Sequence, residues 1–163
     1  YKLKIMNYCH RFCGDRALAE DLAQEVFLRM YRAAPKYRPK ARFATWLFTI
    51  ATNVCLNETR KRRKLSGTIS FDVPIETREG TIVPEYPDSR QGPDEVIMGE
   101  AGREAIQAAM AALPDRQRAA LLLKIQHEFS YKEIARQLRC TENTVKTLIR
   151  RARQRIAETL GHE

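Results

Sequence analysis

The middle of the chain cannot continue the helical pattern that lies on both sides of it. Residues 66–94 contain four prolines and three glycines, and their apolar residues show no helical period. Proline removes a backbone donor and glycine adds backbone freedom, so such a segment interrupts regular structure. The sequence therefore predicts two helical blocks, residues 1–65 and 95–163, joined by an irregular linker over residues 66–94.

The charge of the chain divides along the same boundaries. Residues 1–64 hold 15 Lys/Arg and 5 Asp/Glu, a net charge of +10, and residues 101–163 hold 12 and 7, a net charge of +5. Residues 65–100 hold 2 and 8, a net charge of −6, which brings the 163-residue chain to +9. Two basic blocks and an acidic connector favour a polyanionic partner.

The cysteines do not predict a disulfide framework or a metal site. Cys9, Cys13, Cys55 and Cys140 all fall within helical patterns, where reduced cysteines serve as small apolar core residues. Reduced thiols suit a cytosolic compartment. Cys9, His10 and Cys13 have no second Cys/His pair at a usable spacing, so we expect no metal and no cofactor.

No apolar run is long enough to cross a membrane, and the chain has no signal-peptide pattern. It begins with Tyr rather than Met and opens directly on a helical pattern, which suggests a trimmed fragment that lacks an earlier helix.

Residues 16–33 have the pattern of an amphipathic helix with an acidic outer side. The expected buried face consists of Ala19, Leu22, Ala23, Val26, Phe27 and Met30. Asp21, Gln24, Glu25 and Leu28 fall on the opposite side. An acidic face with an outward leucine would repel DNA, so it indicates either a protein partner or an ordinary solvated surface.

Residues 43–64 predict one long helix that changes character along its length. Leu47, Ile50, Ala51 and Val54 form an expected core face, and the last turns end in the cationic run 60–64. A second stripe beside the core face consists of Trp46, Thr49, Asn53, Asn57 and Arg60. Amides can bond base edges and an indole can stack on a base. The alternative is a Trp at the edge of a core followed by a solvated basic tail.

The C-terminal block predicts a helix-turn-helix. We expect helices over about 95–113, capped by Asp94, and over 115–127. A capping box at Ser130 and Glu133 opens a short helix to Leu138, and Thr141 caps a last helix to about Leu160. Val145, Leu148, Ile149, Ala152 and Ile156 share one face of that helix, opposite Asn143, Lys146, Thr147, Arg150, Arg151 and Gln154. The polar face suits the major groove of DNA, although a solvated charged face is the alternative.

At this point the chain resembles a known family. The segments AEDLAQEVFLRMYR (19–32), FATWLFTIATNVCLNETRKRR (43–63), LPDRQRAALLLK (113–124) and FSYKEIARQLRCTENTVKTLIRRARQRI (129–156) are similar to those of bacterial extracytoplasmic-function (group IV) sigma factors. The resemblance implies an all-α fold. It comprises a sigma-two helical domain over 1–65, an acidic linker over 66–94 and a sigma-four helix-turn-helix domain over 95–163.

The resemblance also implies partners: core RNA polymerase, promoter DNA of a stress-type set, and an anti-sigma factor that clamps both domains. It gives the polymerase-docking surface as Asp21, Gln24, Glu25, Phe27 and Leu28. It gives the surface for the minus-ten strand as Trp46, Thr49, Asn53, Asn57, Arg60, Lys61, Arg62 and Arg63. It gives the surface for the minus-thirty-five duplex as Lys124, Asn143, Thr144, Lys146, Thr147, Arg150 and Arg151.

The chain departs from the family pattern at one position of the long helix, and two other classes of function are alternatives to a sigma factor. Position 49 is Thr where many members carry a basic residue, so the preferred minus-ten sequence is expected to differ. A stand-alone helix-turn-helix regulator is the alternative function, but it gives no reason for the residue 21–28 face or for the Trp46–Asn53 stripe. An enzyme is disfavoured, because His10, His127 and His162 lie far apart and no phosphate loop is present.

Overall fold

The computed structural model describes residues 1–67 and 99–161, and within these ranges its regular structure is helical throughout. The N-terminal half contains α1 (Lys2–Cys13), α2 (Arg16–Ala33), the short 3-10 helix η1 (Ala34–Lys36) and α3 (Phe43–Ser66). The C-terminal half contains α4 (Glu100–Ala111), α5 (Asp115–His127), α6 (Tyr131–Leu138) and α7 (Glu142–Gly161). The all-α prediction is confirmed, whereas the linker expected over 66–94 lies almost entirely outside the described residues.

Local capping chemistry explains where these helices begin and end. Gly14 ends α1 with φ +75°, and the Asp15 carboxylate accepts hydrogen bonds from the backbone of Ala17 and Leu18 at the start of α2. The predicted capping box is present, because the Ser130 hydroxyl accepts from the Glu133 backbone while the Glu133 carboxylate accepts from the Ser130 backbone. The Thr141 hydroxyl caps α7 by accepting from the backbone of Thr144.

The bounds of α4 differ from the expected helix over 95–113. The described part of this helix runs from Glu100 to Ala111, with Gly99 as its N-cap, and the predicted cap Asp94 lies outside the described residues. Its C-terminal end comes early because Pro114 disfavours helical backbone at Leu113. Leu113 is nevertheless 3% exposed, so it contributes to the core from the turn between α4 and α5.

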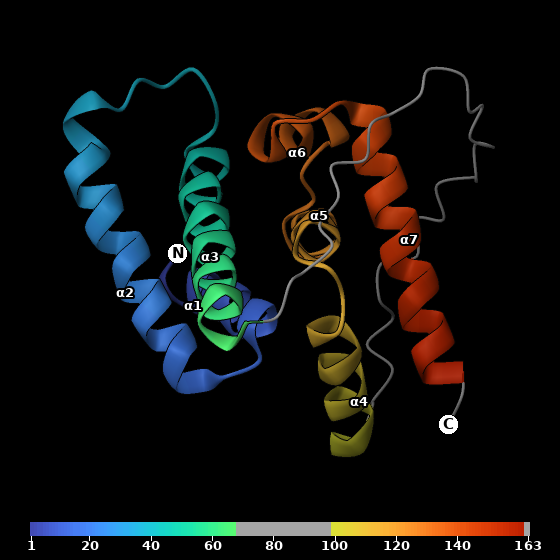
Figure 1. Ribbon diagram of the computed structural model, residues 1–163. Coiled ribbons are helices and arrows are strands. Elements are labelled where there is room, and N and C mark those ends of the chain that lie inside the picture. Colours follow the sequence, from blue (N-terminus) through green and yellow to red (C-terminus); the bar gives the residue numbers. More distant parts are fainter. Residues whose placement is uncertain (68–98, 162–163) are drawn as a thin grey trace.

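The two halves pack directly against each other. Figure 1 shows α1, α2 and α3 (blue to green) on one side of the molecule and α4 to α7 (yellow to red) on the other. Helix α1 contacts α4 and α5, and α3 contacts α5 and α6. The buried apolar residues form one cluster that runs from Ile5 and Leu47 in the first half to Leu121 and Ile149 in the second.

Arg118 of α5 joins the halves through backbone carbonyls. Its side chain lies in the interior, where burial lowers the pKa of the guanidinium. The guanidinium donates to the carbonyls of Met110, Ala111 and Leu113 at 2.7–2.8 Å, which closes the turn between α4 and α5. It also donates to the carbonyl of Phe12 at 2.7 Å and lies 5.1 Å from the centroid of that ring. One buried side chain thus satisfies carbonyls from both halves of the chain.

Two ion pairs lie along the contact between α3 and the C-terminal half. Arg63 pairs with Asp115, and Arg42 pairs with Glu133 at 3.0 Å. Glu133 also accepts a hydrogen bond of 3.1 Å from the Thr45 hydroxyl. Burial opposes ionisation of Glu133, but the hydrogen bonds from Ser130, Arg42 and Thr45 outweigh it and lower the pKa of the carboxyl to about 2.

His127 at the end of α5 packs among aromatic rings from both halves. Its ring centroid lies 3.8 Å from that of Phe48, 5.8 Å from that of Tyr8 and 6.0 Å from that of Phe129. Burial, together with the charges of Lys4 and Arg11, lowers the pKa of His127 to about 4. The imidazole is therefore neutral in the folded protein near pH 7.

We predict that Arg118→Leu lowers the free energy of unfolding by about 3 kcal/mol, because several buried carbonyls lose their donor. Urea denaturation monitored by circular dichroism measures this change. The matched control is Arg153→Leu on α7, an exposed position where we expect a change within about 0.5 kcal/mol. Equal effects of the two substitutions would contradict the role given to Arg118.

A second prediction concerns the thermal stability of the protein at acidic pH. The pKa of His127 is lower in the folded state than in the unfolded state, so protonation favours unfolding as the pH falls from about 6.5 toward 4. The thermal midpoint should fall across this window, and His127→Phe should reduce the fall while keeping an aromatic ring. Scanning calorimetry between pH 7.5 and pH 5 tests this; an unchanged slope in the variant would contradict it.

Candidate nucleic-acid interface

The stripe predicted on the long helix occupies one side of α3. Asn53, Asn57 and Arg60 are exposed, whereas Leu47, Ala51 and Val54 on the core side are buried. Thr49 is half-buried, and its hydroxyl donates to the carbonyl of Thr45 at 2.7 Å. The two amides are therefore the groups on this stripe that are most available to an outside partner.

Trp46 belongs to a cluster of aromatic rings at the start of α3. Its ring lies 4.5 Å from Tyr37 and 5.7 Å from Phe43, measured between centroids, and Phe43 lies 5.3 Å from Tyr1. Trp46 is only partly exposed. The cluster holds the indole at the edge of the core, with part of its surface open for stacking.

The cationic residues at the end of α3 differ in whether they form ion pairs. Arg60, Lys61 and Lys64 are exposed, and Arg62 pairs with Glu58 at 3.1 Å one turn earlier. Arg63 points the other way, toward Asp115 of α5, and is half-buried. The structure therefore places Arg63 at the contact between the halves and leaves the other cations exposed to solvent.

Most of the α7 residues that the sequence assigned to a DNA surface are exposed. Asn143, Lys146, Arg150 and Arg151 are exposed, and Thr147 is half-buried with its hydroxyl bonded to the carbonyl of Asn143. Thr144 differs: it is 7% exposed and its hydroxyl lies 2.9 Å from that of Thr141. This side chain contacts Thr141 at the cap of α7 and is buried there, so it is not on the exposed face.

Tyr131 is a residue of this surface that the sequence reasoning did not identify. Its ring lies 4.5 Å from the ammonium of Lys124 and 5.6 Å from that of Lys146, measured to the ring centroid. An aromatic face attracts ammonium groups, so Tyr131 holds the two lysines near each other. The spacing in sequence carries no sign of this, because Lys124, Tyr131 and Lys146 come from three different helices.

The outer side of α2 carries the predicted acidic face. Asp21 and Gln24 are exposed, Leu28 is 52% exposed, and Glu25 pairs with Arg29 at 2.6 Å, which lowers the pKa of its carboxyl. Phe27 is partly buried and packs against the core. Tyr31, one turn after Leu28, is 78% exposed and was missed, although its spacing from Leu28 was available in the sequence.

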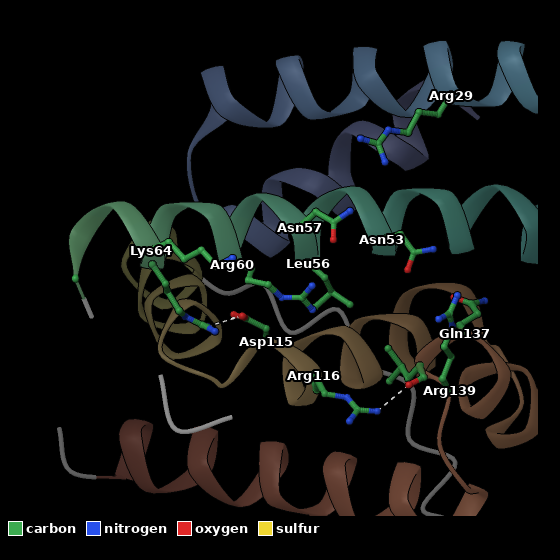
Figure 2. A pocket seen from close by; sticks show the side chains of 13 residues that line it. Arg29, Asn53, Leu56, Asn57, Arg60, Lys64, Asp115, Arg116, Gln137 and Arg139 are labelled. Atoms are coloured by element: carbon green, nitrogen blue, oxygen red, sulfur yellow. Dashed lines mark hydrogen bonds and ion pairs between the residues drawn. The ribbon is translucent and has the colours of Figure 1, made fainter. Parts of the chain in front are cut away.

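A cavity of about 1040 Å³ lies between α3 and the helices α5 and α6. Figure 2 shows Asn53, Asn57, Arg60 and Lys64 on its α3 side and Asp115, Arg116, Gln137 and Arg139 on the opposite side. Five of its lining residues are arginines and one is lysine, whereas Asp115 is its acidic residue. The cavity therefore combines amide groups with an excess of positive charge.

Within 1–67 and 99–161, no three His, Cys, Asp or Glu side chains are arranged to hold a metal ion. Among the helices of these ranges, none has the length and apolar character needed to cross a membrane.

Comparison with known proteins identifies both halves. Residues 1–65 match the family described as Sigma-70 region 2, and residues 103–156 match Sigma-70, region 4. The chain is 32% identical over 161 residues to the ECF RNA polymerase sigma factor SigW of Bacillus subtilis, covering 98% of this chain and 84% of that protein. It is 35% identical over 168 residues to SigG of Mycobacterium tuberculosis, covering 96% of this chain but 45% of that protein.

A solved structure has a similar fold. The sigma factor RpoE of Bartonella quintana, crystallised in complex with the anti-sigma factor NepR, superposes with a TM-score of 0.71. The match covers 98% of this chain and 91% of that one at 22% sequence identity.

Proposed function

The chain belongs to the extracytoplasmic-function sigma factors of bacterial RNA polymerase, and we propose that it reads a promoter in two different ways. The N-terminal half takes the minus-ten element as a melted single strand, and the C-terminal half takes the minus-thirty-five element as duplex. Sigma factors direct promoter-specific transcription initiation and are not enzymes; nucleotide addition belongs to the polymerase. The proposed domains are residues 1–65 and 95–163.

The observation that carries this proposal is the difference in chemistry between α3 and α7. Asn53 and Asn57 are exposed amides that follow a partly exposed indole, that of Trp46, along the same helix, a combination that suits unstacked bases. The exposed face of α7 holds Lys146, Arg150 and Arg151, which suit phosphates and the major groove of intact duplex. A chain with both surfaces can hold a promoter on each side of the point where its strands separate.

Capture of a single strand by α3 requires that the captured base first be unstacked from its neighbours. Flipping a base out of the stack costs a few kcal/mol, which pocket contacts must offset. The amides of Asn53 and Asn57 supply hydrogen bonds, and Trp46 supplies a stacking surface. Arg60, Lys61 and Arg62 lie further along the same helix, where they are placed to hold neighbouring phosphates.

On the α7 side, we assign base and phosphate contacts to the exposed Asn143, Lys146, Arg150 and Arg151, with Thr147 at their edge. Lys124, which Tyr131 holds toward Lys146, is assigned to the phosphate backbone. Thr144 supports this surface from beneath by capping the helix, without touching DNA itself.

The acidic side of α2 is proposed as the polymerase-docking surface. Asp21, Gln24 and Glu25 form a polar rim beside the exposed apolar side chain of Leu28, and Tyr31 extends this surface by one turn. Negative charge makes this side unsuited to DNA, which supports a protein partner. The protein acts in the cytoplasm, where polymerase and chromosome meet.

We further propose that an anti-sigma factor regulates the chain. The fold likeness to RpoE in its complex with NepR supports this proposal. The contact between the two halves brings surfaces from both into reach of one partner chain.

The experiment that tests the function is transcription in vitro with purified bacterial core polymerase, followed by mapping of start sites on genomic fragments. We expect start sites that depend on this chain. Tight duplex binding without core, together with no chain-dependent start sites, would instead identify a stand-alone helix-turn-helix regulator.

We predict that Gln24→Ala with Glu25→Ala weakens association with core polymerase by about tenfold or more, because contacts at the centre of an interface dominate its affinity. Duplex binding by the free chain should not change. Fluorescence anisotropy of the labelled chain with core measures the effect.

The matched control is Glu100→Ala with Glu104→Ala, which removes two exposed acids from α4. Equal weakening by both pairs would show that total charge, and not the α2 face, determines docking.

Asn53→Ala should reduce promoter opening by about tenfold, the effect of losing about 1.4 kcal/mol of hydrogen bonding to a captured base. Permanganate reactivity of the melted strand measures opening, while polymerase association should be retained. Asn7→Ala, an exposed asparagine on α1, is the control. Normal opening with Asn53→Ala would place strand capture elsewhere.

A further inference from the structure

The cavity between α3 and α5–α6 gathers positive charge from two parts of the chain that are far apart in sequence. Arg60 and Lys64 come from α3, Arg116 comes from α5, and Arg139 lies in the turn before α7. Within the described ranges, none of these four forms a salt bridge with a carboxylate, while Asp115, which also lines the cavity, pairs with Arg63.

Bringing like charges together around one cavity costs Coulomb energy, most of all where surrounding protein reduces the access of water. An anion in the cavity would remove that cost. The packing of the two halves therefore creates a cationic site that favours a negatively charged ligand.

The other residues that line the cavity indicate which class of ligand it can bind. Asn53 and Asn57 present exposed amides to the same cavity, and Leu56 adds an apolar surface between them. Guanidinium groups bind phosphate oxygens in pairs, and a carboxamide can bond a base edge. A volume of about 1040 Å³ is at the upper end of the range for small-molecule sites, so the cavity has room for more than a single phosphate.

We propose that this cavity binds a polyphosphate anion, with Arg60, Lys64, Arg116 and Arg139 as the phosphate-binding residues. Arg116 lines the cavity from α5, and one of its nitrogens donates to the carbonyl of Leu138 at 2.7 Å, which fixes the position of the side chain (Figure 2). The ligand contacts both halves, so its binding stabilises their packed arrangement. It also occupies the α3 side that the proposed strand-capture function uses.

The test is titration calorimetry of the free chain with tripolyphosphate and, separately, with ATP in the absence of magnesium. We expect one molecule bound per chain and a rise in the thermal midpoint. ATP binding tighter than tripolyphosphate identifies a nucleotide as the ligand, with the amides contacting its base. Equal binding identifies the phosphate chain alone as the recognised group.

The variant is Arg116→Gln with Arg139→Gln, which removes two charges from the cavity while keeping hydrogen-bond donors and leaving the α3 stripe unchanged. We expect at least tenfold weaker binding and no ligand-dependent rise in the thermal midpoint. The control, Arg153→Gln with Arg155→Gln, removes the same charge from exposed positions of α7, and we expect less than a threefold change.

Equal weakening by the two pairs would overturn the proposal, because it would show general adsorption of polyanions to a basic protein. Absence of one-to-one binding would overturn it as well. These results are distinguishable from failure of the proposed function, since binding is measured on the free chain and transcription is measured with core polymerase.

Discussion

The packing of the two halves depends on the buried guanidinium of Arg118. A charged group in the interior is costly unless all its donors are satisfied, and here backbone carbonyls supply the acceptors. Three of them belong to the last two residues of α4 and to the turn that follows, and the fourth is that of Phe12 at the end of α1. Separation of the halves would leave the Phe12 carbonyl without its donor, so the same interaction that shapes the C-terminal half also holds it against the N-terminal half.

This packing decides which way the polar side of α3 faces. With α5 and α6 placed beside α3, Arg63 becomes an interface residue through Asp115, and Arg42 and Thr45 meet Glu133. Asn53, Asn57 and Arg60 then line one wall of a cavity whose other wall comes from the C-terminal half. The proposed strand-capture surface and the proposed anion site thus share residues, which gives a physical route by which a ligand could compete with promoter DNA.

Much of the local structure could be predicted because it depends on near neighbours. The capping box at Ser130 and Glu133, the turn over 139–141 and the buried face around Val145 follow from propensities and spacing within a few residues. The exposed amides of α3 and the exposed cations of α7 were found for the same reason. The burial of Thr144 could not be predicted, because the pattern of one helix does not show how deeply its first turn sits against the rest of the domain.

The sequence alone determined most of the helices, the caps at Ser130 and Thr141, the division into two basic blocks and the membership of a sigma-factor family, since each rests on residue types at short or characteristic spacing. Only the tertiary structure decided that Arg118 bridges the halves, that Tyr131 holds Lys124 near Lys146, and that Arg63 faces Asp115. Each of these contacts joins residues from different helices, and a periodic pattern specifies the face a residue occupies but not the partner that the face will meet.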